Sequence, residues 1–365
     1  MLDQPMSRRQ AISLLIMFNF GSSVVMGVST ETAQDAWISL LLAIVYTVPV
    51  VIMYARIMAL NPDMDFFDAL EARLGKIAGK AVTVLMVWYS LHLCALVLRN
   101  FSEFIQISSL LDTPQLPVLF IMLLAVCYLA KSGIKALGKW ALATFPVVFA
   151  IVILTVVLSI NVMSFDNILP FFEHSFGEIA TDALRIFSFP LGETVLFLSV
   201  ADCVHKKDNP QKIYLGGILF SSLLLAIIIL RNLFVLGASV VSIVYFPSYA
   251  AARVINLGDF LSRIEGSISI NFILAGITKI TVCLISASKG LAKLFEAGDY
   301  RRLVMPTGLL AVALSVILYQ NTMEMFAFIK YYAVYAMPFQ AVLPALLWIV
   351  SEIRTRRGQI LAARG

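Results

Sequence analysis

The sequence predicts an all-α polytopic membrane protein with about ten transmembrane helices. Of its 365 residues, 60% are hydrophobic and only 13% are charged, whereas a soluble globular domain usually carries about 25% charged residues. Apolar runs of about 20 residues, each long enough to cross a hydrocarbon core about 30 Å thick, recur from one end of the chain to the other. Lysine and arginine also collect in alternate loops between these runs. These observations exclude a water-soluble protein.

The apolar runs and their polar flanks give the order of the spans. We place them at residues 10–29, 37–59, 80–108, 115–131, 138–161, 179–203, 213–237, 267–290, 304–320 and 328–350. The first run follows Arg8 and Arg9 but lacks an A-x-A-like cleavage site, so we interpret it as a retained span and not as a signal peptide. We therefore expect one transmembrane domain, residues 1–365. Within it, residues 1–161 would form a first five-helix repeat, 179–350 a second, and 351–365 a cytoplasmic tail.

The distribution of charge predicts the orientation of the chain. With the N-terminus inside, the cytoplasmic segments carry Arg8, Arg9, Arg56, Arg73, Lys76, Lys80, Lys131, Lys135, Lys139, Lys206, Lys207, Lys212, Lys289, Lys293, Arg301, Arg302, Arg354, Arg356, Arg357 and Arg364. The outer loops carry mainly acids, namely Glu31, Asp35, Asp112, Asp166, Glu173 and Glu324, and only segment 238–266 adds the cations Arg253 and Arg263. Because basic residues in short loops favour the cytoplasmic side, both termini are expected there. The net charge of +5 is spread over many loops, which does not indicate nucleic-acid binding.

Two spans carry helix-breaking residues at matching positions. With five spans in each half, span six enters the membrane from the side opposite span one, so an inverted repeat is possible. Secondary transporters of that design place their site at the midplane, between interrupted helices in corresponding positions. Span one carries the run from Asn19 to Ser23 about eleven residues from its cytoplasmic edge, near mid-depth at about 1.5 Å per residue. Span six carries the Phe-Pro-Leu-Gly-Glu run of residues 189–193.

Glycine and proline weaken helices, and backbone groups freed at mid-depth must line a cavity or meet a ligand. The predicted ligand-binding residues are Asn19, Gly21, Ser22, Ser23 and Val24 in span one, with Phe189, Pro190, Leu191, Gly192 and Glu193 in span six. The alternative is that these residues merely kink their helices, as we interpret Pro49, Pro146 and Pro338.

Two ionisable residues lie deep within spans. Glu193 sits at the break of span six, and Lys279 lies at a similar depth in span eight. An unpaired charge there is costly, so we expect both to face one polar interior, as an ion pair or through a bound ligand. Lys279 could also take the place of a bound cation, which would give the pair a coupling role. The alternative is a pair of neutral groups that are hydrogen-bonded for packing alone. Arg99, Glu103, Arg185 and Arg231 lie nearer the outer ends, where snorkelling suffices.

Signatures of catalysis and of metal binding are missing from the sequence. We find no GxxxxGK[ST], HExxH, GxSxG or GxGxxG motif. The histidines His92, His174 and His205 are far apart, and Cys94, Cys127, Cys203 and Cys283 show no metal-ligand spacing. We therefore expect no enzyme activity, no cofactor and no metal.

Several short motifs, in this order and spacing, resemble the endospore germination permeases. They are Gly21-Ser22-Ser23, the run Gln34-Asp35-Ala36-Trp37-Ile38-Ser39, Phe-Pro-Leu-Gly-Glu at 189–193, Lys206-Lys207, Ile255-Asn256-Leu257-Gly258-Asp259-Phe260, Arg263-Ile264-Glu265 and the stretch from Ile277 to Leu291. The family comprises the GerAB-like B subunits of nutrient germinant receptors and belongs to the amino acid–polyamine–organocation (APC) superfamily. The resemblance covers essentially the whole chain.

The resemblance implies a LeuT-like five-plus-five inverted repeat with broken helices 1 and 6, in the spore inner membrane. It also implies an A-type subunit and a lipoprotein C-type subunit as partners, and a small nutrient, commonly an amino acid, in the central cavity. The ligand's carboxylate would meet the free backbone of Gly21 to Val24, and its amino group the carbonyls of Phe189 to Gly192. Two features depart from the family: Ser23 replaces a second glycine, and Val28-Ser29-Thr30 lacks the usual proline.

Three functions fit this scaffold. The first is a sensor subunit whose conformational equilibrium shifts when nutrient binds and triggers germination. The second is an autonomous proton- or cation-coupled amino acid transporter, and the third is a nutrient-gated ion pore. Uptake of labelled amino acid by vesicles that contain this protein alone would favour transport.

Overall fold

The computed structural model describes residues 5–28, 31–108, 112–205, 208–255 and 264–362. Within these ranges the regular elements are helices, and no β-strand is formed. Some motif residues lie outside the described residues, namely Ser29, Thr30, Lys206, Lys207, Arg263, Arg364 and residues 256–260.

The helices follow the predicted spans closely. In chain order they are α1 (Arg8–Met26), α2 (Ala36–Leu60), α3 (Phe66–Leu74), α4 (Lys76–Ser108), α5 (Gln115–Lys131), α6 (Ile134–Ser159), α7 (Phe176–Ser188), the 3₁₀ helix η4 (Leu191–Cys203), α8 (Pro210–Leu236), α9 (Ala238–Val241), α10 (Pro247–Val254), α11 (Glu265–Leu294), α12 (Arg301–Ile317), α13 (Thr322–Met337), the π-helical turn η6 (Pro338–Val342) and α14 (Leu343–Ala362). Short 3₁₀ turns, η1 (Ala33–Asp35), η2 (Ile160–Val162) and η3 (Phe165–Ile168), lie in the connections. Eight helical stretches in the described chain are long and apolar enough to cross a membrane. With α5 and α12, which pack on each other and on α4, they make up the predicted ten.

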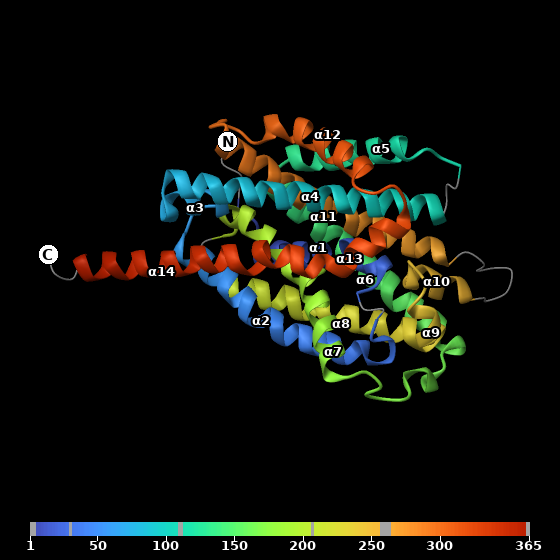
Figure 1. Ribbon diagram of the computed structural model, residues 1–365. Coiled ribbons are helices and arrows are strands. Elements are labelled where there is room, and N and C mark those ends of the chain that lie inside the picture. Colours follow the sequence, from blue (N-terminus) through green and yellow to red (C-terminus); the bar gives the residue numbers. More distant parts are fainter. Residues whose placement is uncertain (1–4, 29–30, 109–111, 206–207, 256–263, 363–365) are drawn as a thin grey trace.

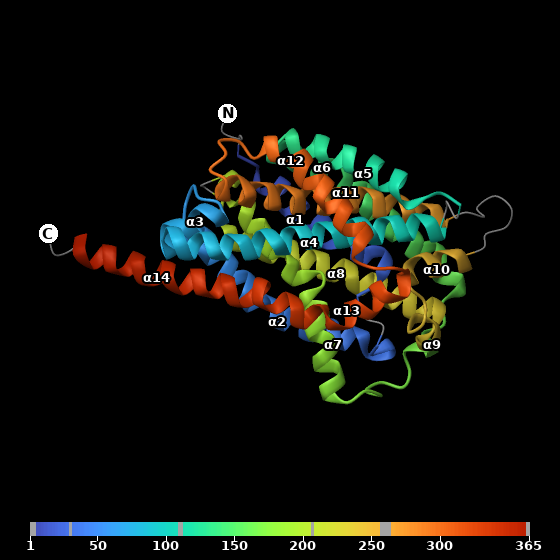
Figure 2. The ribbon, with the colours of Figure 1, turned by 45° about the horizontal axis from the view of Figure 1, so that its top comes forward.

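The long helices run roughly parallel, so the bundle has two ends (Figures 1 and 2). Both chain termini lie towards the end that carries α3, called here the α3 end, and the opposite one is the α10 end. The C-terminal helix α14 extends beyond the other helices at the α3 end (Figure 1).

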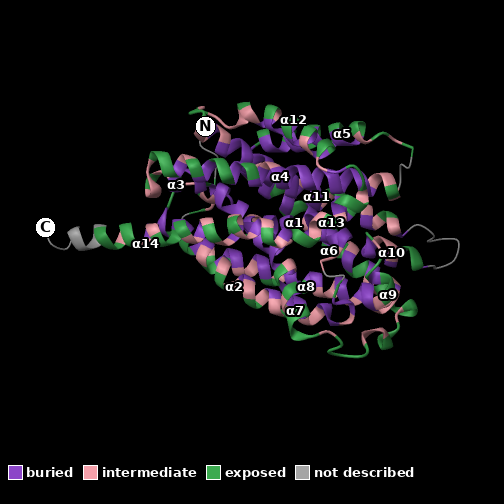
Figure 3. Ribbon diagram, in the orientation of Figure 1, coloured by how far each residue is buried: buried purple, intermediate pink, exposed green. Residues whose placement is uncertain are grey.

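The core is built around α1 and α11, which pack against each other and are largely buried (Figure 3). The peripheral helices expose apolar side chains instead, such as Ile121 and Tyr128 on α5, which are 72% and 77% exposed. Side chains of this kind face hydrocarbon in a membrane protein, where burial of apolar surface against protein is not required. The division into two repeats, residues 1–161 and 179–350, stays a prediction.

The predicted break in span one is wrong. Helix α1 runs without interruption through Asn19–Ser23 and ends at Met26, where Gly27 adopts a positive φ of 73° and donates its N–H to the Ser23 carbonyl. A positive φ is accessible to glycine at no steric cost, so Gly27 and not Gly21 ends the helix. The Ser23 hydroxyl donates to the Asn19 carbonyl at 2.6 Å, a bond that serine makes within a helix.

The predicted break in span six is present. Helix α7 begins with a capping box, in which Ser175 and Glu178 satisfy each other's backbone N–H groups, and ends at Ser188. Phe189 is extended, and the chain resumes after Pro190 as η4. Proline restricts the preceding residue to extended conformations and has no N–H to donate. The sequence Phe189-Pro190 therefore accounts for the interruption.

Candidate ligand-binding site

An ion pair lies at the break of span six. Glu193, in the first turn of η4, pairs with the ammonium group of Lys279 on α11. Both side chains are fully buried. The expectation that the two charges face one interior is therefore met by a direct contact.

Aromatic rings enclose the ammonium group. The Nζ atom of Lys279 lies 5.4 Å from the ring centroid of Phe18 on α1 and 4.9 Å from that of Phe189. The negative faces of aromatic rings attract a cation, most strongly where water is excluded. The Tyr332 hydroxyl on α13 donates to the second carboxylate oxygen of Glu193 at 2.8 Å. The pair is thus held by α1, α11, α13 and the broken span.

Gly21 explains how the lysine stem reaches this position. A Cβ at Gly21 would lie 2.5 Å from both Cβ and Cδ of Lys279, a distance that non-bonded carbon atoms do not adopt. The glycine therefore permits the close approach of α1 and α11. This contact, and not a break in the helix, accounts for a glycine at position 21.

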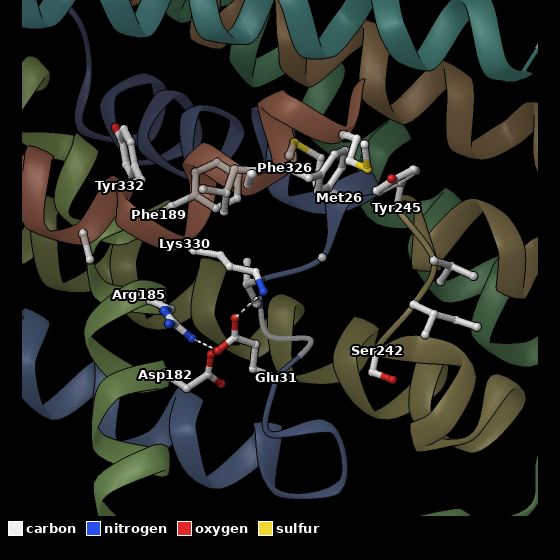
Figure 4. Close-up of a pocket in the computed structure, with 18 residues that line it drawn as sticks. Met26, Glu31, Asp182, Arg185, Phe189, Ser242, Tyr245, Phe326, Lys330 and Tyr332 are labelled. Carbon is white, nitrogen blue, oxygen red and sulfur yellow. Dashed lines mark hydrogen bonds and ion pairs between the residues drawn. The ribbon is translucent and has the colours of Figure 1, made fainter. Parts of the chain in front are cut away.

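A cavity of about 390 Å³ opens from the α10 end towards the pair (Figure 4). We call it the vestibule. It is lined by the end of α1, by α7, by the segment that joins α9 to α10, and by α13. Its charged residues include Glu31, which pairs with Arg185 and lies 3.8 Å from the ammonium group of Lys330. Its apolar residues include Met26, Phe189, Tyr245, Phe326 and Tyr332 (Figure 4).

A smaller cavity of about 30 Å³, the inner pocket, lies against Glu193. It shares Met26, Phe189, Ile329 and Tyr332 with the vestibule. Its remaining wall comes from α4 and α13 and is apolar apart from Asn100. The two cavities are therefore neighbours, with these four side chains in the wall of both.

The span-one residues predicted to bind ligand are buried in helix contacts. Asn19 donates to the Ser221 hydroxyl at 2.9 Å, Ser22 and Val24 are buried, and Ser23 bonds within the helix. The expectation that a ligand carboxylate meets free backbone at Gly21 to Val24 is wrong, because the N–H groups of these residues belong to an intact α-helix.

The predicted span-six residues surround the break itself. Phe189 lines both cavities. The carbonyl of Leu191 accepts from the Thr194 hydroxyl at 2.6 Å, and that of Gly192 lies 3.4 Å from the Tyr54 hydroxyl. Pro190 is buried at the break. Several freed backbone groups of the break are thus satisfied by side chains of the protein.

Sequence reasoning missed several residues of the site. Tyr332 is one of several tyrosines in span ten, whose hydroxyls could face a cavity but which are also typical of the membrane interface, and Tyr89 and Asn100 carry no distinguishing pattern. Gln340 is fully buried in the π-helical turn of span ten, and its amide nitrogen donates to Tyr89 and to the Ser188 carbonyl, both at 2.8 Å. The sequence signal for Gln340 was a polar amide side chain within the apolar run that follows Pro338.

Several ion pairs lie at the α3 end of the bundle. Lys289 of α11 contacts Asp202 at 2.8 Å and Asp65 at 3.4 Å. Lys293 contacts Asp68 at 2.8 Å, beside a polar cavity of about 640 Å³. Burial raises the pKa of the Asp65 carboxyl, and the nearby Lys289 opposes this only in part. The hydrogen bond from Lys80 lowers the pKa of Glu296.

Comparison with known proteins decides the family. The sequence pattern of the spore permeases, a family described as "Spore germination protein", matches residues 5–325. The chain belongs to the spore germination permease family. Spore germination protein KB of Bacillus subtilis (strain 168) is 24% identical over 356 residues, 96% of this chain and 95% of that protein. Putative spore germination protein YfkT of the same strain is 25% identical over 327 residues, 89% of each chain.

Solved structures share the fold of this spore permease. MhsT in complex with L-phenylalanine aligns with a TM-score of 0.65 at 14% identity, over 96% of this chain and 89% of MhsT. Mhp1, a nucleobase-cation-symport-1 family transporter in a closed conformation with bromovinylhydantoin bound, aligns with a TM-score of 0.59 at 14% identity, over 95% and 78% of the two chains. Both have the LeuT fold, which confirms the predicted all-α, LeuT-like fold class apart from the break in helix 1. The spore permease is a multi-pass membrane protein and a germinant receptor subunit or permease, not an enzyme.

Proposed function

We propose that this chain is the B subunit of a nutrient germinant receptor and that it binds a small nutrient, an amino acid, to trigger spore germination. The observation that carries the proposal is the buried ion pair of Glu193 and Lys279 at the break of span six, where Glu193 lines an inner pocket that adjoins the vestibule. Intramembrane charges that are paired and lie beside a cavity are typical of functional sites.

The vestibule suits an amino acid in size and in charge. Its volume of about 390 Å³ falls within the usual range for small-molecule sites, about 300–1,000 Å³. Arg185 and Lys330 offer cations to a carboxylate, Glu31 offers an acceptor to an ammonium group, and Phe326 offers an apolar surface. A ligand that advances from there reaches the inner pocket, where Phe189, Glu193 and Tyr332 would contact it.

Lys279 and Glu193 would couple binding to the conformation of the bundle. The ammonium group takes the place of a bound cation, because it is fixed by Glu193 and two aromatic rings at the centre of the fold. A ligand amino group that competes for Glu193 would loosen the contact between η4 and α11. Such a differential interaction with two conformations is what a population shift requires.

We place the protein in the spore inner membrane with the α3 end in the cytoplasm, so that both termini are cytoplasmic and the vestibule faces outwards. The support is the excess of lysine and arginine near the α3 end, which the positive-inside rule places in the cytoplasm. An A-type subunit and a lipoprotein C-type subunit would receive the conformational change.

The alternative function is autonomous amino acid transport, driven by protons or cations, or a nutrient-gated pore. The LeuT fold shared with MhsT and Mhp1 favours this alternative. Accumulation of labelled amino acid in vesicles that contain this chain alone would support transport. A nutrient response that requires the partner subunits, without accumulation, would support sensing.

A panel of amino acids, sugars and nucleosides tests the site directly. A ligand that binds the folded state raises apparent thermal stability by mass action, by about 2.7 kcal/mol at 100 times its Kd. We expect an amino acid to raise the melting temperature of the purified protein, and Glu193→Gln to abolish the rise. If no member of the panel stabilises the wild-type protein, or if Glu193→Gln responds normally, the proposed site is refuted.

A further inference from the structure

A continuous chain of hydrogen bonds links span ten to the carboxylate of Glu193. The amide nitrogen of Gln340 donates to the Tyr89 hydroxyl at 2.8 Å, the hydroxyls of Tyr89 and Tyr332 are 3.2 Å apart, and Tyr332 donates to Glu193 at 2.8 Å. The members of this chain are almost completely buried. These bonds therefore lie within the protein interior.

The hydrogen bonds of this chain all point in one direction, from Gln340 as the first donor to Glu193 as the last acceptor. A carboxylate only accepts, so the one proton of Tyr332 goes to Glu193. Tyr332 must then accept from Tyr89, and Tyr89 accepts from the Gln340 nitrogen. If Glu193 instead held a proton on that oxygen and donated it to Tyr332, the hydroxyl of Tyr332 would turn to Tyr89. The proton of Tyr89 would then be buried without an acceptor, which costs free energy.

Gln340 is locked in the orientation that maintains this direction. Its nitrogen also donates to the carbonyl of Ser188, the last residue of α7, at 2.8 Å. Turning the amide over would place its oxygen against that carbonyl, and two acceptors repel each other. The amide oxygen has no hydrogen-bond partner among the described residues. It lies 2.5 Å from the position of a Cβ on Gly192, so only glycine leaves room for it there.

The π-helical turn brings Gln340 to the break of span six. Pro338–Val342 forms this turn where α13 meets α14, and π-helical turns inside helices commonly occur at functional sites. The Tyr54 hydroxyl donates to the Gln340 backbone carbonyl and also lies near the carbonyl of Gly192. Both the backbone and the side chain of Gln340 thus contact the interrupted segment.

We propose that Gln340 is a positioning residue that keeps Glu193 ionised for as long as the break of span six holds its present geometry. When the break rearranges, the Ser188 carbonyl moves away and the amide of Gln340 is free to turn. The amide oxygen then accepts the proton of Tyr89, the hydrogen bonds of the chain reverse their direction, and Glu193 can hold a proton. A proton is therefore the ion coupled to movement of span six. This inference rests on the proposed coupling role of Glu193 and Lys279.

Other titratable groups face Glu193 and must be considered in any titration. They are Lys279 and Cys283 of α11, Tyr332 of α13, Tyr89 of α4, Tyr54 of α2 beside Gly192, and Tyr214 of α8, whose hydroxyl lies 3.5 Å from the Thr194 carbonyl. Helix α1 contributes no titratable side chain beyond Arg8 and Arg9 in its first turn. Among these groups, only Tyr332 and Lys279 bond to the carboxylate.

The test is an infrared titration of the full-length protein in lipid nanodiscs, without nutrient, between about pH 3 and pH 10, a range that includes the ordinary pKa values of carboxyl and imidazole groups. The carbonyl band of the protonated acid is assigned as the band that Glu193→Gln loses. We expect Gln340→Met and Tyr89→Phe each to move the midpoint of this band up by about one pH unit, a tenfold change in the equilibrium, because each removes a donor whose hydrogen bond polarises the next one towards the ionised carboxylate. Because both variants interrupt the same chain of hydrogen bonds, the double variant should move the midpoint no further than either single variant does.

Tyr335→Phe is the matched control, because it removes a hydroxyl of the same span that takes no part in the chain of hydrogen bonds from Gln340 to Glu193. Its midpoint should equal that of the wild type. An unchanged midpoint in Gln340→Met or in Tyr89→Phe overturns the inference, as do shifts that add in the double variant. The inference is also overturned if Glu193 keeps the same protonation state over the whole pH range in the wild type and in the variants. The readout needs no nutrient, so absence of nutrient binding would refute the proposed function separately.

Discussion

Lys279→Met is the sharpest perturbation of the site, because it removes a charge and keeps most of the packing. The methionine side chain can follow the path of the lysine stem past Gly21, and its sulfur can contact the rings of Phe18 and Phe189. What it cannot replace is the ammonium group that pairs with Glu193. Both members of the pair are 0% exposed, so the variant leaves a buried carboxylate without its counter-charge.

The size of the effect follows from this burial. Removing one partner of a buried ion pair costs about 3–5 kcal/mol, whereas replacing both partners with neutral groups is often tolerated. Lys279→Met and Glu193→Gln should therefore each lower the free energy of unfolding by about 3–5 kcal/mol. The double variant should lose less than either single one, because it leaves no unpaired charge. Independent effects would instead add to about 6–10 kcal/mol.

Denaturant titration of the purified protein in detergent measures these differences, provided that the four proteins unfold with the same dependence on denaturant. A double variant that is less stable than both single variants would refute the view that the two side chains form one electrostatic unit. A Lys279→Met protein as stable as the wild type would show that Glu193 is not left as a buried charge.

Other predictions address packing and the two ends of the bundle. Gly21→Ala should lower the melting temperature, because its Cβ would lie 2.5 Å from the Lys279 stem, whereas Gly216→Ala, with its nearest atom at 3.5 Å, should not. Asp35→Asn should cost about 1.5–3 kcal/mol and speed proteolysis of segment 160–175, because Asp35 accepts the backbone N–H groups of Phe172 and His174. Asp65→Asn keeps the N-cap of α3 but removes a carboxyl whose pKa burial raises. A carboxyl whose pKa is higher in the folded than in the unfolded state destabilises the folded state at pH values above the folded pKa, where it is ionised. Below its unfolded pKa it is protonated in both states and has no such effect. The variant should therefore be more stable than wild type at neutral pH, with the difference vanishing in acid, and an advantage that persists in acid would contradict this.

Much of the fold could be predicted, because the bilayer imposes simple rules on the chain. Length and hydropathy located the spans, and Pro190 located the break in span six, since proline affects the backbone whatever surrounds it. Glycine is ambiguous by comparison. Gly21 could mark an unwound segment or a close contact, and the sequence does not show that Lys279 lies opposite. The break assigned to span one was wrong for this reason.

The polar network of the site was less predictable than its ion pair. Charges in hydrocarbon need partners, so Glu193 and Lys279 could be paired from depth alone. Tyr332 and Gln340 are neutral, and many neutral groups in spans bond to their own helix. Their partners are distant in sequence: Gln340 and Tyr89 are 251 positions apart. Only the fold brings such residues together.

The uninterrupted α1 also changes how a ligand would be oriented. A helix that ends at Met26 presents its last carbonyls, and hence partial negative charge, to the cavities that Met26 lines. The same holds for α7, which ends at Ser188. The start of η4 at Leu191 presents N–H groups instead. An amino group is therefore favoured beside the end of α1 and beside the Glu193 carboxylate, and a ligand carboxylate is favoured towards the cations Arg185 and Lys330. This polarity at α1 is opposite to the one that an unwound span one would give.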